Sequence, residues 1–211
     1  MRELSQSKYN CIHQALLQTL EAISRTVDTR DPYTATHQRR VAALGRAMAL
    51  EIGWDEETVL GVYLGGLIHD IGKLYIPAEI LNRPGRLNEV ELLLIKTHSA
   101  VGRDIIAGIQ FPWPLAAMVH QHHERLDGSG YPQGLRGEQI LPQSRLLAIA
   151  DVIDAMSSRR PYREALGIEA ALSEIERYSG QLYDPAAVNI CLTLFNHRGL
   201  TLADLEVSAP F

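Results

Sequence analysis

The stretch GLIHDIGK, residues 66–73, places a histidine and an aspartate directly after an apolar run. We expect this run to end a helix that Asp55 caps at its start, with Gly72 just past the helix end. His69 and Asp70 would then lie at the end of an apolar helix, where burial of unpaired polar groups costs free energy. Because partners or a metal ion must offset that cost, the stretch predicts a helical core that carries a polar site.

The other patterns along the chain also predict helices. Apolar residues between Ile12 and Val27 recur at steps of three and four, as on one face of an amphipathic helix. Further helices are expected at 34–52, from 88 toward 109 (one helix or two in succession), and at 112–123, 142–158, 168–178 and 185–195. No stretch alternates convincingly with the period of two that marks a strand. We therefore expect an all-α fold.

The helices group into a single helical bundle domain at 31–211, preceded by the amphipathic helix at 1–30. This first helix could pack on the domain, mediate dimerisation or receive a signal. Its apolar stripe is short for a coiled coil, which favours packing. The sequence contains no internal repeat and no low-complexity segment.

Composition narrows the class of protein. The chain has 211 residues, 46% of them hydrophobic, and a formal net charge of −5. The acidic balance argues against a protein that coats nucleic acid or binds membranes through basic residues. The two cysteines lie far apart, without the spacing of a zinc finger. The chain has neither an apolar run of the roughly 18 residues that span a bilayer nor the hydrophobic centre of a signal peptide. We expect a soluble cytoplasmic protein.

A second polar stretch, HHERLDGSGYP at 122–132, places two adjacent histidines before a loop rich in glycine. Gly128 and Gly130 permit a positive φ and a close approach of the backbone to another group. Further along the chain, Asp151 interrupts the apolar run LLAIADVIDAM at 146–156. A buried aspartate is disfavoured unless it is paired or binds a cation. These polar residues therefore point to one metal site.

Helix geometry favours two metal ions over one. Neighbouring residues on a helix point about 100° apart, so His69 and Asp70 cannot easily bind the same ion side by side, and the same holds for His122 and His123. A carboxylate that bridges two ions resolves the difficulty. Imidazole and carboxylate ligands without thiolate suit iron, manganese, zinc or nickel. Two ions roughly 3.5–4 Å apart would orient a water, lower its pKa and stabilise an in-line displacement at phosphorus.

HDIGK followed by HHERLDGSGYP resembles the HD-GYP subgroup of the HD-domain metal-dependent phosphohydrolases. The similarity runs from about residue 31 to 184 and includes DPYTATHQRRV, IPAEILNRPGRL, KTHSAVG, LRGEQILPQSRLLAIADVIDAM and RRPYREAL. Members of the subgroup hydrolyse cyclic di-GMP, and some act on related cyclic dinucleotides. The resemblance implies an HD-type helical bundle with a central di-metal site and a GYP loop.

Site residues follow from the resemblance, position by position. Asp70 would bridge the ions and, with Lys73, form the catalytic pair. Tyr131 would present its ring and hydroxyl to a ligand or brace the loop. Glu124, Asp127 and Asp154 would orient the histidines and the loop. The implied metal ligands are His37, His69, Asp70, His98, His122, His123 and Asp151, and the implied substrate-binding residues are Lys73, Gly130, Tyr131, Arg160 and Arg163.

The chain departs from the subgroup at Leu126, where tryptophan is common, at Ser99, where proline is common, and at Tyr33. Members that hold a third metal have glutamate at the position of Tyr33. Its absence implies two divalent ions. As the metal we favour iron or manganese over zinc or nickel. Members also usually carry a sensory domain, so the chain could be a fragment or could receive its signal from another protein.

The sequence thus predicts a phosphodiesterase that hydrolyses cyclic di-GMP to linear pGpG, with GMP as a further product to be tested. An alternative is a non-catalytic cyclic di-GMP receptor, or a module that binds a GGDEF protein, with a blocked site. A third reading, a different HD phosphohydrolase, is disfavoured by the intact GYP loop. Expected partners are cyclic di-GMP and a sensory or GGDEF-domain protein, with a homodimer as an option and no nucleic acid.

Overall fold

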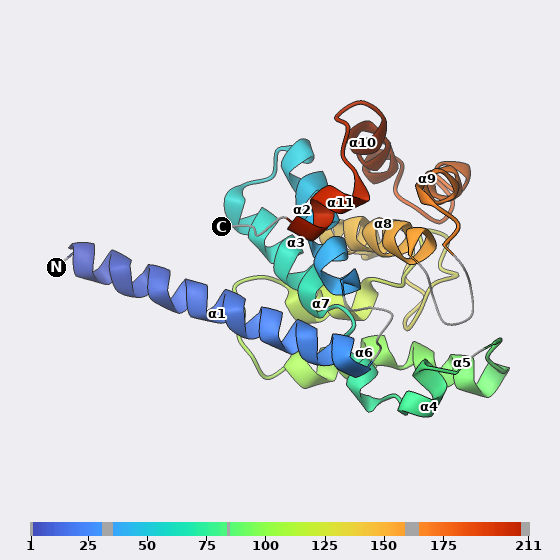
Figure 1. Ribbon diagram of the computed structural model, residues 1–211, viewed down its shortest axis with the longest axis horizontal. Coiled ribbons are helices and arrows are strands. Elements are labelled where there is room, and N and C mark those ends of the chain that lie inside the picture. Colours follow the sequence, from blue (N-terminus) through green and yellow to red (C-terminus); the bar gives the residue numbers. More distant parts are fainter. Residues whose placement is uncertain (1, 31–35, 84, 159–164, 208–211) are drawn as a thin grey trace.

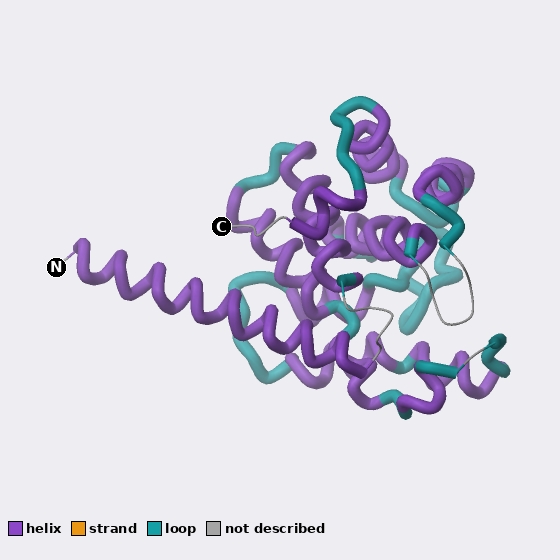
Figure 2. The backbone as a smooth tube through the Cα atoms, viewed as in Figure 1, coloured by secondary structure: helices purple, strands orange, loops and turns teal. Residues whose placement is uncertain are grey.

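A computed structural model describes residues 2–30, 36–83, 85–158 and 165–207. Its regular elements are all helical (Figure 2), apart from the isolated bridges Asp127–Arg136 and Ser179–Tyr183, which confirms the predicted all-α class. The elements are α1 (Arg2–Arg30), α2 (His37–Ile52), α3 (Glu56–Ile68), η2 (Ile71–Tyr75), α4 (Ala78–Leu81), α5 (Glu89–Lys96), α6 (His98–Ile106), α7 (Leu115–Gln121), η3 (Gly137–Gln139), α8 (Pro142–Ser157), α9 (Ile168–Arg177), α10 (Pro185–Asn196) and α11 (Leu202–Val207).

Helix α3 is the centre of the bundle, and every residue from Val59 to Ile68 is buried. It packs against α2, which in turn packs against α8, and α7 lies against both α3 and α8 (Figure 1). The backbones of α2 and α3 approach closely, because a Cβ added at Gly66 would lie 2.6 Å from the Cα of Ala42. A helix buried on every side fixes the position of whatever follows its last residue, here His69 and Asp70.

Helix caps explain several boundaries. The side chain of Asp55 accepts a hydrogen bond of 2.9 Å from the backbone N–H of Thr58, so the predicted cap of α3 is present. Asn88 and Glu91 form a capping box at the start of α5. Gly53 ends α2 with a φ of 84°.

The segment from Asn88 toward Ile109 consists of two helices, α5 and α6. Side chains take the carbonyls that one continuous helix would need: the hydroxyl of Thr97 donates to the carbonyl of Leu94, and His98 Nδ1 donates to that of Ile95. Leu94 is exposed, and α5 has no buried residue. His98 therefore begins α6 and lies with the buried residues of that helix, whereas Leu94 of α5 is exposed.

Two further differences concern the ends of the chain. Helix α11 was not predicted; Thr201 and Asp204 exchange hydrogen bonds across its start. In α1 the apolar stripe is buried only toward its C-terminal end, at Leu20 and Val27, whereas Ile12 is 70% exposed. The other end of α1 extends away from the bundle (Figure 1). Its role and the boundary at residue 30 stay predictions. Tyr33, Arg160 and Arg163 lie outside the described residues.

Among the described residues, no helix combines the length and apolar character needed to cross a bilayer.

Candidate metal centre

Histidine and aspartate side chains meet in two groups at the core of the bundle, and Asp70 belongs to both. Within each group, one nitrogen or oxygen per residue lies within 4.8 Å of the others. The first group is Asp70, His98, His122 and His123; the second is His37, His69 and Asp70. The fold therefore brings together six of the seven predicted ligands, which lie far apart in the sequence.

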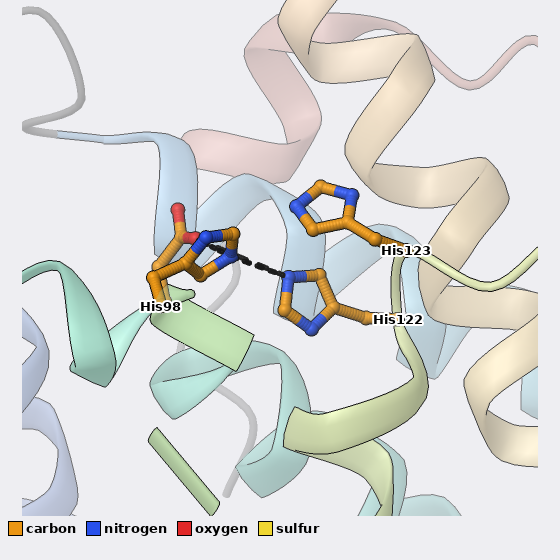
Figure 3. A group of neighbouring side chains, drawn as sticks. His98, His122 and His123 are labelled. Carbon is orange, nitrogen blue, oxygen red and sulfur yellow. Dashed lines mark hydrogen bonds and ion pairs between the residues drawn. The ribbon is translucent and has the colours of Figure 1, made fainter. Parts of the chain in front are cut away.

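Each of these side chains lies at or near a helix end. His37 begins α2, His69 and Asp70 follow α3, His98 begins α6, and the pair at 122–123 follows α7. Figure 3 shows His98, His122 and His123 pointing toward one another. Asp151, the seventh predicted ligand, differs from these six because it lies within a helix, α8. Helix ends leave backbone carbonyls free to accept hydrogen bonds from side chains, which matters for the imidazoles below.

The two carboxylate oxygens of Asp70 face different histidines. Oδ1 lies 3.3 Å from Nε2 of His98 and 4.0 Å from Nε2 of His122. Oδ2 lies 3.4 Å from Nε2 of His69 and 3.7 Å from Nε2 of His37. This arrangement would let Asp70 give one oxygen to each of two ions, which is the bridging role that the resemblance implies for it.

Asp151, the seventh predicted ligand, lies between the groups, although it belongs to neither. Its Oδ1 is 3.3 Å from Nε2 of His37, and its Oδ2 is 3.7 Å from Nδ1 of His123. The carboxylate thus faces one histidine of each group across from Asp70.

Hydrogen bonds at Nδ1 fix the orientation of four imidazoles. His69, His98 and His122 each place Nδ1 2.7 Å from the carbonyl of the residue three positions earlier, Gly66, Ile95 and Val119. Nδ1 of His37 lies 2.6 Å from Oδ2 of Asp154. Because these oxygens only accept, Nδ1 carries the proton, and Nε2 presents its lone pair to the centre. This is the tautomer that binds a metal through Nε2.

The residues fit a pair of cations. Nε2 of His98 and Nε2 of His122 lie only 3.1 Å apart, and with both protons at Nδ1 the two lone pairs face each other. Nε2 of His69 and Oδ1 of Asp70 are buried, and neither has a hydrogen-bond partner in the described part of the chain. Such an arrangement is unfavourable unless positive charge lies between the atoms.

The pKa shifts agree with this charge state. Burial lowers the pKa of His98, and it lowers those of His122 and His123 well below their usual value, so these imidazoles are neutral. Burial alone would raise the pKa of Asp70, but the Lys73 ammonium and the nearby histidines hold it well below its usual range. These three imidazoles are therefore neutral and the carboxylate of Asp70 is ionised, which is the form in which each group binds a metal.

Lys73 lies directly beside the shared carboxylate. Its Nζ donates a hydrogen bond of 2.5 Å to Oδ2 of Asp70, and its side chain is 14% exposed. The ammonium is thus at the edge of the centre and reachable from solvent, where its predicted contact with a phosphate can be tested.

The loop at 124–135 covers the centre from the side of His123. The ring of Tyr131 stacks on that of His123, with centroids 4.6 Å apart and an interplanar angle of 29°. Lys96 places Nζ 5.3 Å from the centroid of the same ring. A Cβ at Gly130 would lie 2.4 Å from the Cα of Glu124, so the loop needs glycine there. These contacts support the bracing role for Tyr131, and a ligand contact stays a prediction. Lys96 was not predicted; its place two residues before His98 was the only signal.

Glu124 fastens this loop, as the sequence led us to expect. It is buried, and its Oε1 and Oε2 accept hydrogen bonds from the backbone N–H groups of Gln133 (2.7 Å) and Leu135 (3.0 Å). Because each bond to a charged acceptor contributes about 1.5–3 kcal/mol, Glu124→Ala should lower the free energy of unfolding by at least about 3 kcal/mol. Urea denaturation measures this, with exposed Glu138→Ala as the control. Equal stability of the two variants would contradict the fastening role.

Comparisons with known proteins agree on one family. The model of the family described as "HD domain" matches residues 21–187. The cyclic di-GMP phosphodiesterase response regulator RpfG of Xanthomonas campestris is 37% identical over 185 residues, which are 87% of this chain and 49% of the relative. The 3'3'-cGAMP-specific phosphodiesterase 1 of Vibrio cholerae is 42% identical over 151 residues, 72% of this chain and 35% of the relative.

A comparison with solved structures finds a similar fold. The crystal structure of a cyclic GMP-AMP-specific phosphodiesterase of V. cholerae superposes with a TM-score of 0.68 at 22% identity, covering 90% of this chain and 50% of the other. The chain spans half or less of the length of these relatives.

Proposed function

The chain belongs to the HD domain family and is closely related to the HD-GYP phosphodiesterases of cyclic dinucleotides, and from this we propose that it hydrolyses a cyclic dinucleotide, with cyclic di-GMP as the substrate. The observation that carries the proposal is the position of Asp70, whose two oxygens face two different pairs of histidines. An aspartate with a purely structural role needs partners around one oxygen only. A carboxylate that is shared between two ions needs a separate group of ligands beside each oxygen.

The proposed ligands are His37, His69 and Asp70 for one ion, Asp70, His98, His122 and His123 for the other, and Asp151 between them. Two divalent ions, iron or manganese in preference to zinc or nickel, would orient a water and lower its pKa for attack on phosphorus. The tautomers set by the Nδ1 hydrogen bonds hold the four Nε2 lone pairs in place before any ion binds, so little reorganisation is required.

Side chains at the edge of the centre would handle the substrate. Lys73 would neutralise the charge that develops on the phosphate oxygens, and Arg160 and Arg163 would bind the phosphates further along. Tyr131 offers a ring beside His123 on which a base could stack. The leaving group is the 3′ oxygen, so the first product is linear pGpG, with GMP as a second product if both diester bonds are cut.

Lys73→Ala tests the role of the ammonium. We expect turnover to fall at least about tenfold, because a charge-assisted contact to phosphate contributes roughly 1.5–3 kcal/mol. Metal content and melting temperature should stay close to wild type. Arg83→Ala, which removes a half-exposed cation paired with Glu91, is the matched control. Unchanged kinetics for Lys73→Ala would limit Lys73 to its ion pair with Asp70 and remove its proposed contact with the substrate.

The substrate is tested by measuring kcat/KM for cyclic di-GMP and for 3'3'-cGAMP on the same metal-loaded preparation. We expect the larger value for cyclic di-GMP. The reverse order would move the substrate to 3'3'-cGAMP and leave the reaction class intact. Tight binding of either dinucleotide without any turnover would instead identify the non-catalytic receptor.

A further inference from the structure

Arg40 lies one turn after His37 on α2 and joins separate parts of the chain. Its Nε donates to Oδ1 of Asp154 in α8, and its Nη2 lies 3.3 Å from Oδ2 of the same carboxylate. Nη2 also donates to Oγ of Ser158 (2.7 Å). Nη1 donates to Oγ1 of Thr36 (2.5 Å) and to Oε1 of Glu206 in α11 (2.9 Å). The guanidinium thus reaches α8, α11 and the start of its own helix.

Asp154 connects this cation to the metal centre. Its Oδ2 accepts the 2.6 Å hydrogen bond from Nδ1 of His37, and Nε2 of the same imidazole faces Asp70 and Asp151. The side chains of His37 and Asp154 are only 2% and 3% exposed. A buried carboxylate with the imidazole as its one strong partner could rotate. The two nitrogens of Arg40 that face its oxygens remove that freedom.

We infer that Arg40 is a positioning residue for the metal centre, which acts through Asp154 to hold the imidazole of His37 toward the ion shared with His69. The inference rests on the proposed function, because it requires the centre to bind metal. Metal ligands of this kind depend on the group that accepts their other ring N–H, and loss of that group typically costs 10- to 100-fold in metal affinity or activity. Arg40 acts one contact further from the ion, because it holds Asp154, the group that accepts the ring N–H of His37.

The same guanidinium holds the end of α8. Ser158 donates its backbone N–H to the carbonyl of Asp154 (3.0 Å) and offers its hydroxyl to Arg40. Beyond Ser158 the chain continues toward Arg160 and Arg163. Arg40 therefore fixes a metal ligand and the point from which the proposed phosphate-binding segment departs.

Arg40→Lys is the informative variant, because lysine keeps the charge but cannot place two nitrogens on one carboxylate. We expect manganese(II) to bind 10- to 100-fold more weakly to one of the two sites of this variant, measured by calorimetric titration of metal-stripped protein. Glu206→Gln, which loosens the contact with α11 alone, and Arg198→Lys, which alters an exposed pair with Glu51, should bind manganese(II) as the wild type does.

The controls separate the possible failures. If the wild type binds no metal, the proposed function fails. If the wild type and Arg40→Lys bind manganese(II) equally, only the positioning role fails. A loss shared by Glu206→Gln would move the role from the metal centre to the packing of α11, which also overturns the inference.

A magnetic resonance measurement that does not use Arg40→Lys covers the case in which that variant does not fold. Nitrogen-15 spectra of histidine-labelled, metal-free protein should show His37 protonated at Nδ1, with its proton shifted downfield by the bond to Asp154. A proton at Nε2 instead would overturn the inference, because Asp154 would then not hold the ring. Asp154→Asn should shift this resonance, whereas Glu206→Gln should leave it unchanged.

Discussion

Asp70→Ala should release the metal ions from both groups and abolish turnover. Asp70 faces both groups of ligands, because its Oδ1 faces His98 and His122 and its Oδ2 faces His37 and His69. Each histidine among the proposed ligands belongs to one group only. Removal of Asp70 also leaves Lys73 without the partner that lies 2.5 Å away. An unpaired ammonium at that position would repel a cation, so the variant loses two attractive contacts and gains a repulsive one.

Elemental analysis after desalting measures this result directly. We expect less than one ion per chain for Asp70→Ala, compared with two for the wild type. His69→Ala should lose mainly one ion, since its Nε2 faces only one oxygen of Asp70. Asp104→Ala, at a side chain that is 64% exposed, is the control and should keep both ions. An Asp70→Ala protein with two ions and normal hydrolysis would show that the carboxylate does not bridge.

Gly72→Ala should destabilise the fold and disturb the metal centre together. A Cβ at Gly72 would lie 1.9 Å from the carbonyl oxygen of His98 and 2.6 Å from the backbone nitrogen of Gly102. Neither atom belongs to a flexible side chain, so α6 must shift as a unit, and His98 shifts with it. Overpacking of a core typically costs 1–3 kcal/mol and sometimes more, and we expect a loss of at least about 3 kcal/mol here because backbone must move.

Urea denaturation and metal analysis of the same variant check both parts of this prediction. Gly108→Ala is the matched control, because a Cβ there would have no atom within 4 Å and no positive φ is involved. Gly72→Ala should be much less stable than the control and should hold the ion of His98 and His122 poorly. Similar stability and metal content in the two variants would contradict the close packing of η2 on α6.

The sequence predicted site residues best where a polar residue type stands out from its apolar surroundings. Polar residues inside apolar runs, such as His69 and Asp151, had to face partners, and the structure brings them to one centre. The angle between neighbouring residues on a helix indicated a carboxylate that bridges two ions, and the resemblance assigned that role to Asp70, whose two oxygens face different histidines. The same argument was wrong for His122 and His123, which lie in one group with Asp70 and His98. Both residues follow the last residue of α7, so the angle between neighbours on a helix does not separate them.

Contacts between segments distant in sequence could not be predicted. Arg40 and Asp154 are separated by 114 positions, and only the packing of α2 on α8 brings them together. The break at Thr97 depends on side chains that take backbone carbonyls, a choice that helix propensity does not reveal. Helix α11 was missed because six residues carry too few apolar positions to show a period.

The central claim is that the buried histidines and aspartates hold two ions and that the protein then hydrolyses a cyclic dinucleotide. The most direct test is anaerobic reconstitution of the metal-free protein with iron(II) or manganese(II), addition of cyclic di-GMP and separation of the products by chromatography. We predict that linear pGpG appears only after metal is added and that Asp70→Ala forms none. Full binding of two ions per chain with cyclic di-GMP and 3'3'-cGAMP both left intact would contradict the claim.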